Sequence, residues 1–300
     1  MGTDTPHRES RRPLYHWGIL FFGILALSTG SVLVRLAQAP SLVVGAWRMF
    51  LATALLTPLA LPRLRREWAA LTHRDLLLLC LAGVALAIHF AAWISSLAYT
   101  TVTSSVMLVS TNPIFVGLAS HYILKERLNW RAVAAIGVTL LGTMIVSYGD
   151  LTLSREVLWG DALALMGAVA ASAYLLLGRA VRRKLSTLAY VWPCYGIAAL
   201  ILLSLCLVTR QPLLGYGGST YLVLLLLAIA PQILGHSAFN WALAHFSPIF
   251  VTLAILGEPI GATILAWLIL QEAPPLTALA GWALIMVGIY AASREEAAAS

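Results

Sequence analysis

A few polar side chains inside long apolar runs are the residues of this sequence best suited to chemistry. Glu258 precedes Pro259, Asn112 precedes Pro113, and each pair lies well inside an apolar run. Proline cannot donate a backbone hydrogen bond and tends to open a helix. A carboxyl group at such a place can carry a proton or bind an amine, or it can bond a carbonyl that the kink frees. Both interpretations of Glu258 stay open, and Asn112 has the same geometry without the charge.

Two stripes of polar and aromatic side chains follow the spacing of a helix face. The stripes are His89 and Trp93 on one run, and Gln232, His236 and Asn240, with Trp241 beside them, on another. Two such stripes are what a shared aqueous cavity needs, because polar groups inside a membrane face water or one another. The alternative is that each histidine is an ordinary packed residue.

Tyr174 and Arg48 are two further polar residues inside apolar runs. Tyr174 is a candidate to line the same cavity. Arg48 cannot lose its charge, and we favour a structural or gating role for it over binding of a substrate carboxylate. The candidate substrate-binding residues are His89, Trp93, Asn112, Tyr174, Gln232, His236, Asn240, Trp241 and Glu258.

The motifs of intramembrane enzymes and nucleotide-driven machines are missing from the sequence. It contains no Gly-x-Ser-x-Gly, no His-Glu-x-x-His and no Walker loop. The three cysteines, Cys80, Cys194 and Cys206, have neither the spacing of metal ligands nor that of a disulfide framework. We therefore expect no catalytic residue, no metal ligand and no cofactor.

The apolar runs that carry these residues predict an all-α polytopic membrane protein. Hydrophobic residues make up 60% of the 300-residue chain and charged residues 10%, against roughly 45–50% and 25% in soluble domains. A membrane-spanning helix needs about 20 apolar residues. Ten segments qualify: 15–36, 41–61, 76–97, 104–124, 131–149, 158–178, 188–208, 219–241, 248–270 and 276–293.

The basic residues indicate how these spans are oriented. The net charge is +7, and with the N-terminus inside, fifteen Lys and Arg residues fall on the inner side and three on the outer side. This bias follows the positive-inside rule. It predicts a multi-pass protein of the cell (inner) membrane with both termini in the cytoplasm. Because the basic residues lie in short loops at span ends, they also exclude nucleic acid as a partner.

The chain repeats itself after 146 residues. The segment NPIFVGLASHYILKE returns as EPIGATILAWLILQE, and a shift of 142 residues aligns Trp17 with Trp159. Residues 1–149 and 150–300 are therefore predicted to form two five-helix units. An odd number of spans inverts the second unit, an arrangement that recurs in secondary transporters with a site near the midplane. If the halves exchange conformations, the cavity opens first to one side and then to the other. A duplicated structural bundle is the alternative.

The sequence resembles the drug/metabolite transporter superfamily, and within it the EamA-like ten-helix transporters. The resemblance covers nearly the whole chain. It lies in the two five-helix halves, in the pairs Asn-Pro and Glu-Pro of spans four and nine, and in the pairs Lys-Glu and Gln-Glu at the ends of those spans. Lys125–Glu126 and Gln271–Glu272 stand where the family usually has Gly-Glu. The resemblance implies a central cavity lined by spans one, three, four, six, eight and nine, with five and ten peripheral. It also implies export of amino acids or other small metabolites, as in bacterial exporters.

The sequence therefore predicts a secondary transporter that moves amino acids or similar amphipathic solutes across the cytoplasmic membrane by alternating access. The alternative is a non-transporting membrane protein, such as a lipid-modifying enzyme or a scaffold. The expected partners are a small-molecule substrate and the lipid bilayer, with protons as a candidate coupling ion. A monomer is sufficient to enclose a pathway, and a dimer is compatible with the sequence.

Overall fold

The computed structural model describes residues 14–123, 125, 130–148, 154–274 and 277–298. Within these residues all regular secondary structure is helical, and no strand occurs. This part of the chain contains eight helices long and apolar enough to cross a membrane, and two shorter apolar helices, Val133–Gly142 and Ala278–Arg294. Together they form the ten spans of the predicted fold, an all-α membrane protein of two inverted five-helix repeats.

The first repeat contains spans one to five, and spans one and four are interrupted. Its helices are α1 (Leu14–Ser28) and α2 (Gly30–Leu36), α3 (Ser41–Glu67), the short 3-10 turn η1 (Trp68–Ala70), α4 (His73–Ser96), α5 (Val102–Val109) and α6 (Asn112–Tyr122), and α7 (Trp130–Tyr148). Span one breaks at Thr29, and span four breaks between α5 and α6.

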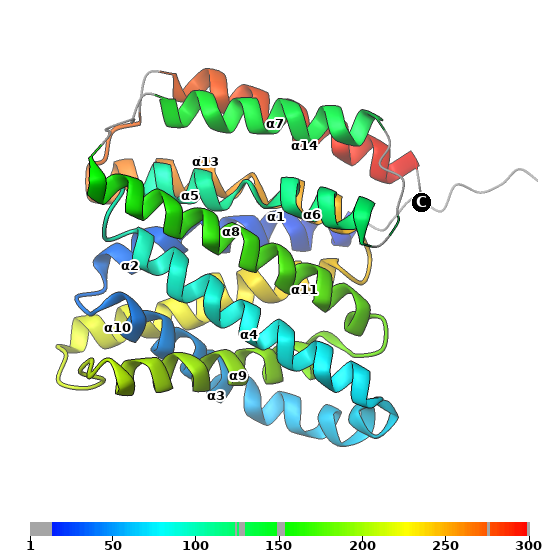
Figure 1. Ribbon diagram of the computed structural model, residues 1–300, viewed down its shortest axis with the longest axis vertical. Coiled ribbons are helices and arrows are strands. Elements are labelled where there is room, and N and C mark those ends of the chain that lie inside the picture. Colours follow the sequence, from blue (N-terminus) through cyan, green and yellow to red (C-terminus); the bar gives the residue numbers. More distant parts are fainter. Residues whose placement is uncertain (1–13, 124, 126–129, 149–153, 275–276, 299–300) are drawn as a thin grey trace, which may run out of the picture.

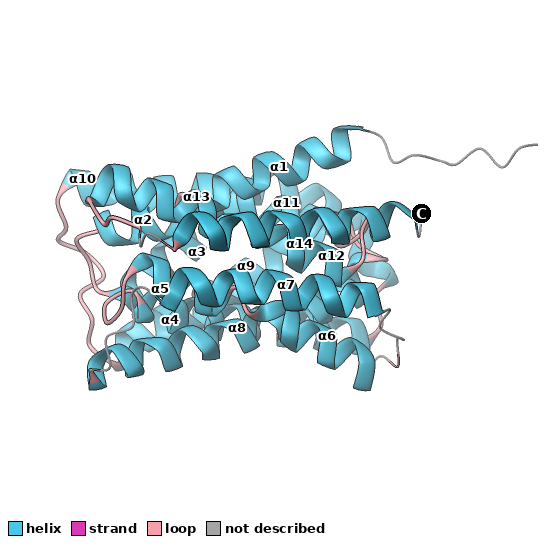
Figure 2. Ribbon diagram, turned by 90° about the horizontal axis from the view of Figure 1, so that it is seen from above, coloured by secondary structure: helices cyan, strands magenta, loops and turns pink. Residues whose placement is uncertain are grey.

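The second repeat contains spans six to ten. Its helices are α8 (Arg155–Arg182), α9 (Thr187–Val208), α10 (Gly218–Leu227), the π-helical stretch η2 (Ala228–His236), α11 (Ser237–Ala242), α12 (Pro248–Ile255), α13 (Glu258–Leu265), the π-helical stretch η3 (Ala266–Leu270), and α14 (Ala278–Ala298). The start of α1 and the end of α14 lie at the same end of the bundle (Figure 2). We call this the terminal end, and the other the opposite end.

Serine and threonine side chains begin five of these helices. Each hydroxyl accepts a hydrogen bond from a backbone N–H in the first turn, which satisfies a donor that the helix itself leaves free. The capping residues are Thr72, Thr101, Ser154, Ser186 and Ser247. At Thr72 the capping is reciprocal, because its backbone N–H donates to the Asp75 carboxylate at 2.9 Å.

The breaks in spans four and nine occupy equivalent positions in the two repeats. The shift of 146 residues carries the bounds of α5 and the start of α6 onto the bounds of α12 and the start of α13. Pro113 and Pro259 lie in the first turns of α6 and α13, where a missing N–H costs least. Each helix therefore restarts at the residue before its proline, which is Asn112 in one repeat and Glu258 in the other.

Spans five and ten lie at one edge of the bundle, where α7 and α14 pack against each other, and α3 packs on α9 at the other edge (Figure 1). Glycines bring α7 and α14 close together. A Cβ added to Gly142 would lie 2.6 Å from the carbonyl oxygen of Gly281, and one added to Gly288 would lie 3.0 Å from that of Ala135. These two glycines are themselves equivalent by the repeat shift.

We expect Gly142→Ala to lower the thermal unfolding midpoint of the purified protein in detergent, because the new methyl group meets the backbone of α14. Gly137→Ala is the matched control on the same helix, since a Cβ there has no atom within 4 Å. The control should leave the midpoint unchanged or raise it, because alanine favours a helix over glycine by about 1 kcal/mol. Equal midpoints for the two variants would contradict the close packing of α7 on α14.

Candidate functional site

A cavity of about 60 Å³ lies between the two repeats. Its walls come from spans one, three, four, six, eight and nine, the six spans that the family resemblance implied. Val109 and Ile255, at the ends of α5 and α12, both line it, and so do Asn112 and Glu258. The cavity therefore lies against both helix breaks. Figure 1 shows α7 and α14 at the edge of the bundle, away from this region.

The cavity brings together seven of the nine predicted site residues. These are His89, Trp93, Asn112, Tyr174, His236, Asn240 and Glu258. Apolar side chains complete the wall, among them Leu27, Leu86, Leu175 and Phe239. The site thus combines a few polar groups with a largely apolar and aromatic surface, which is the usual composition of a small-molecule site.

Gln232 and Trp241 do not line this cavity. Trp241 faces the start of α1, where its ring stacks on His245 with centroids 4.1 Å apart and meets His16 at 5.0 Å. Gln232 is fully buried in η2, and its Oε1 accepts a hydrogen bond from Arg48 Nε at 2.8 Å. Trp241 is thus separate from the cavity, whereas Gln232 connects to it through Arg48 and Trp93.

The two histidines of the predicted stripes meet at the cavity, with ring centroids 6.2 Å apart. His89 Nδ1 lies 2.9 Å from the carbonyl oxygen of Gly167 on α8. A carbonyl only accepts, so the proton of a neutral His89 ring lies on Nδ1, and Nε2 is left as an acceptor. The His89 ring is also nearly parallel to Trp93, at an interplanar angle of 5°. The orientation of His89 is therefore fixed by two neighbouring groups.

Tyr174 and Asn240 link span six to span eight across the cavity. The Tyr174 hydroxyl donates to Asn240 Oδ1 at 2.9 Å, and Asn240 Nδ2 donates to the carbonyl oxygen of His236 at 2.7 Å. Arg182 Nε donates to the carbonyl oxygen of Asn240 at 2.9 Å. The Asn240 side chain is thus held through both its oxygen and its nitrogen. Its position in the cavity wall therefore depends on span six as well as on span eight.

Two serines bind the backbone at the helix breaks in the same way in the two repeats. Each hydroxyl shares its one proton between a carbonyl of its own helix and a carbonyl at a break: Ser28 Oγ lies 2.9 Å from the carbonyl oxygen of Ile24 and 3.3 Å from that of Glu258, and Ser172 Oγ lies 2.8 Å from that of Ala168 and 3.2 Å from that of Asn112. The shift of 142 residues that aligns Trp17 with Trp159 also aligns Gly30 with Ser172. The contacts pair Ser28 with Ser172 instead, because both hydroxyls contact the carbonyl oxygen of the residue at which a broken helix restarts.

Arg48 is fully buried beside the cavity. Its guanidinium Cζ lies 4.4 Å from the centroid of the Phe90 ring and 5.7 Å from that of Trp93, within cation–π distance of both. Glu258 and Arg48 are within electrostatic reach of each other, but they form no ion pair among the described residues. The guanidinium of Arg48 is therefore held inside the bundle, against aromatic rings.

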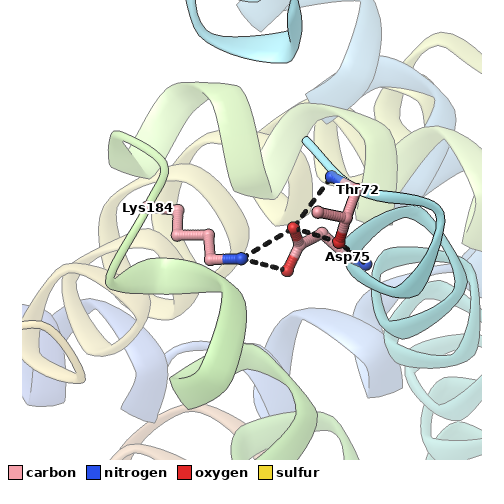
Figure 3. A network of polar contacts seen from close by, with 3 residues as sticks. All are labelled: Thr72, Asp75 and Lys184. Carbon is pink, nitrogen blue, oxygen red and sulfur yellow. Dashed lines mark hydrogen bonds and ion pairs between the residues drawn. The ribbon is translucent and has the colours of Figure 1, made fainter. Parts of the chain in front are cut away.

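Polar contacts tie the two repeats together at the terminal end. Lys184 Nζ lies 2.8 Å from both carboxylate oxygens of Asp75, which also accepts from the Thr72 hydroxyl at 2.7 Å (Figure 3). Next to this pair, the backbone N–H of Ser186 donates to Glu67 at 2.7 Å. Both contacts join the loop after span six to the loop after span two.

A second tie joins the repeats at the opposite end. Arg35 Nη2 lies 3.5 Å from Glu272 Oε1 and donates to the carbonyl oxygen of Thr100 at 2.9 Å. Glu272 Oε2 accepts from the backbone N–H of Val102 at 3.2 Å. The glutamate of the QE motif therefore connects spans one, four and nine. Its repeat counterpart, Glu126, lies outside the described residues.

Metal-binding groups of three or more His, Cys, Asp or Glu side chains do not occur in the described part of the chain. The three cysteines are free thiols there, with Cys194 and Cys206 buried. The chemistry available at the cavity is thus that of hydrogen bonds, aromatic faces, one carboxyl group and one neighbouring guanidinium.

The model of the EamA-like transporter family matches residues 16–148 and 158–294. The chain belongs to the EamA-like transporter family. This places it in the drug/metabolite transporter superfamily, and the two matched segments are the two repeats.

Relatives of similar length carry the same assignment. An uncharacterized transporter of Clostridium kluyveri is 28% identical over 245 residues, which cover 78% of this chain and 77% of its own. The uncharacterized transporter YdfC of Bacillus subtilis is 24% identical over 277 residues, which cover 91% and 86%. A crystal structure with a TM-score of 0.74 and 21% identity covers 94% of this chain and 98% of its own, which is a likeness of fold. The chain is thus a multi-span membrane transporter with a small-molecule substrate.

We expect Lys184→Met to lower the thermal unfolding midpoint, because it leaves the Asp75 carboxylate, whose side chain is only 7% exposed, without its cation. Half of the Lys184 side chain is exposed, so solvent screens the pair and the loss should be small but measurable. Arg183→Met removes an exposed neighbouring charge and should change stability by less than about 0.5 kcal/mol. The tie would be refuted by equal midpoints, or by a Lys184→Met effect that persists undiminished in an Asp75→Asn background.

Proposed function

We propose that this EamA-like transporter is a secondary transporter that exports amino acids or similar amphipathic metabolites through its central cavity by alternating access. The observation that carries the proposal is the position of the cavity. It lies between two inverted repeats, against the equivalent breaks of spans four and nine. A site on the pseudo-symmetry axis of an inverted repeat faces either side of the membrane when the halves exchange conformations.

The lining of the cavity supports an amphipathic solute. Trp93, Tyr174 and the two histidines offer aromatic faces and hydrogen bonds, and Glu258 is the one acid among the described lining residues. A multiply charged phosphate ester needs several basic side chains, and the described lining contains no lysine or arginine. An amino acid with an apolar or aromatic side chain matches this surface, because its charged groups can bind the polar residues and its side chain can pack on the apolar and aromatic ones.

The size of the cavity supports an occluded conformation. At about 60 Å³ it holds only a few water molecules, whereas ligand sites measure roughly 300–1,000 Å³. Polar ties join the repeats at both ends of the bundle. Substrate entry therefore requires one tie to break and the helices beside it to separate. When the two ties break in turn, the cavity opens first at one end of the bundle and then at the other.

The charge distribution supports the orientation. Fifteen basic residues belong to the side that holds both termini and three to the other, so we place the terminal end in the cytoplasm and the protein in the cell membrane. Glu258 is our candidate, among the titratable groups that line the cavity, to carry a coupling proton. The six lining spans belong to one chain, so a monomer is sufficient to enclose the pathway.

The test is solute flux into vesicles that hold the purified protein, with a panel of amino acids and amphipathic drugs. We expect saturable flux for at least one amino acid. Ala171→Phe should lower that flux about tenfold or more, because Ala171 lines the cavity and the larger ring would occupy space that the solute needs. A tenfold loss corresponds to about 1.4 kcal/mol of binding free energy. Ala173→Phe is the matched control on the same helix, since Ala173 lines an outer groove between α4, α6 and α8 instead.

Two results would count against this function. The absence of saturable flux for every compound would favour a non-transporting membrane protein. Equal loss of flux in Ala171→Phe and Ala173→Phe would show that the pathway does not pass through the central cavity.

A further inference from the structure

Arg48 has more hydrogen-bonding capacity than the protein uses. It is 0% exposed, and within the described part of the chain it forms no ion pair. Its Nε donates to Gln232, while Nη1 and Nη2 find no hydrogen-bond partner. The aromatic faces of Phe90 and Trp93 offset part of the cost of this buried charge. They cannot accept the four N–H groups of the two terminal nitrogens.

Two neighbours of Arg48 also hold unused donors. Gln232 accepts from Arg48 through Oε1, and its Nε2 finds no partner. Trp93, whose ring contacts the guanidinium and lines the cavity, has an unpartnered Nε1. Two of these groups lie together beside span one, because a Cβ added to Gly30 would lie 3.5 Å from Trp93 and 3.8 Å from Arg48 Nη1.

The unused groups of this cluster are all donors, and one of them is a cation. Such a cluster lacks an anionic acceptor, since buried donors without partners are costly and are rare in native proteins. A carboxylate fits best, because its two oxygens accept in parallel from the two arms of a guanidinium. A phosphate monoester carries up to two negative charges, whereas these three residues offer a single cation.

We propose that Arg48, together with Trp93 and Gln232, is the subsite for the carboxylate of the transported solute. The substrates are then small carboxylates or zwitterions, and amides or simple amines of the same shape are poor substrates. This inference rests on the proposed function and deepens it. The solute enters through the cavity wall at Trp93, and its amine, where it has one, pairs with the carboxyl group of Glu258.

A purely structural arginine predicts the opposite response to one substitution. Gln232→Glu changes almost no atoms and gives Arg48 a built-in carboxylate at the position of the present 2.8 Å bond. If Arg48 only supports the fold, this variant is more stable and transports as before. If Arg48 binds the solute, the new carboxylate occupies the subsite, and the solute carboxylate is repelled.

The experiment compares flux of phenylalanine and leucine with flux of their carboxamides in vesicles, and thermal unfolding of the same proteins. We expect the unmodified protein to favour the acids by about tenfold or more, as a site built for one hydrogen-bonding group does. Gln232→Glu should lose that preference through a fall in acid flux, with carboxamide flux within about twofold and an unfolding midpoint that is unchanged or raised. Gln232→Met deletes one donor of the subsite without adding a charge, so it should reduce the preference about three- to tenfold, less than Gln232→Glu does.

A second variant makes the test independent of Gln232. Trp93→Phe keeps the aromatic ring and deletes the Nε1 donor, and we expect it to reduce the preference for acids about three- to tenfold. The subsite would be overturned by equal flux of acids and carboxamides in the unmodified protein. It would also be overturned by an acid preference that survives Gln232→Glu, or by failure of Gln232→Glu to fold. Absence of flux for every compound would instead overturn the transporter itself.

Discussion

The structure depends on how the backbone satisfies its hydrogen bonds where two membrane helices break. Inside a bilayer, a carbonyl or N–H without an internal partner costs several kcal/mol. Proline removes a donor in spans four and nine, and α6 and α13 restart beside it. Ser28 and Ser172, each from the first helix of a repeat, then bind a carbonyl at the break of the other repeat. The two halves thus touch at the residues where each broken helix restarts, and the polar cavity lies beside them.

The spans, their repeat and their breaks could be predicted because each has a local signal. Long apolar runs specify the helices, an odd number of spans inverts the second half, and a proline marks the breaks of spans four and nine. Of the seven candidates that line the cavity, His89, Trp93, His236 and Asn240 followed from helical spacing, and Asn112 and Glu258 from the prolines after them. Trp241 illustrates the limit of such reasoning. It follows Asn240 directly, and one residue turns a helix by about 100°, so its side chain faces the start of α1 instead of the cavity.

Other features could not be read from the sequence, because they depend on contacts between distant segments. Gln232 and His236 have the spacing of one α-helix face, but both lie in the π-helical stretch η2, and Gln232 faces Arg48 instead of the cavity. Arg35 and Lys184 looked like loop charges, and only the fold brings them to Glu272 and Asp75. The two repeats also differ, since span one breaks at Thr29 whereas its counterpart α8 is continuous.

Alternating exposure of the cavity can be measured directly by thiol labelling at Ala171, which lines it. The protein would carry Ala171→Cys with its three native cysteines replaced, in vesicles of one orientation, with an impermeant reagent added to either side. Lys184→Met breaks the tie at the terminal end, and Glu272→Gln weakens the tie at the opposite end. The account predicts that each variant labels faster from the side of its own broken tie and more slowly from the other. Faster labelling from both sides at once, or from the same side in both variants, would contradict alternating access.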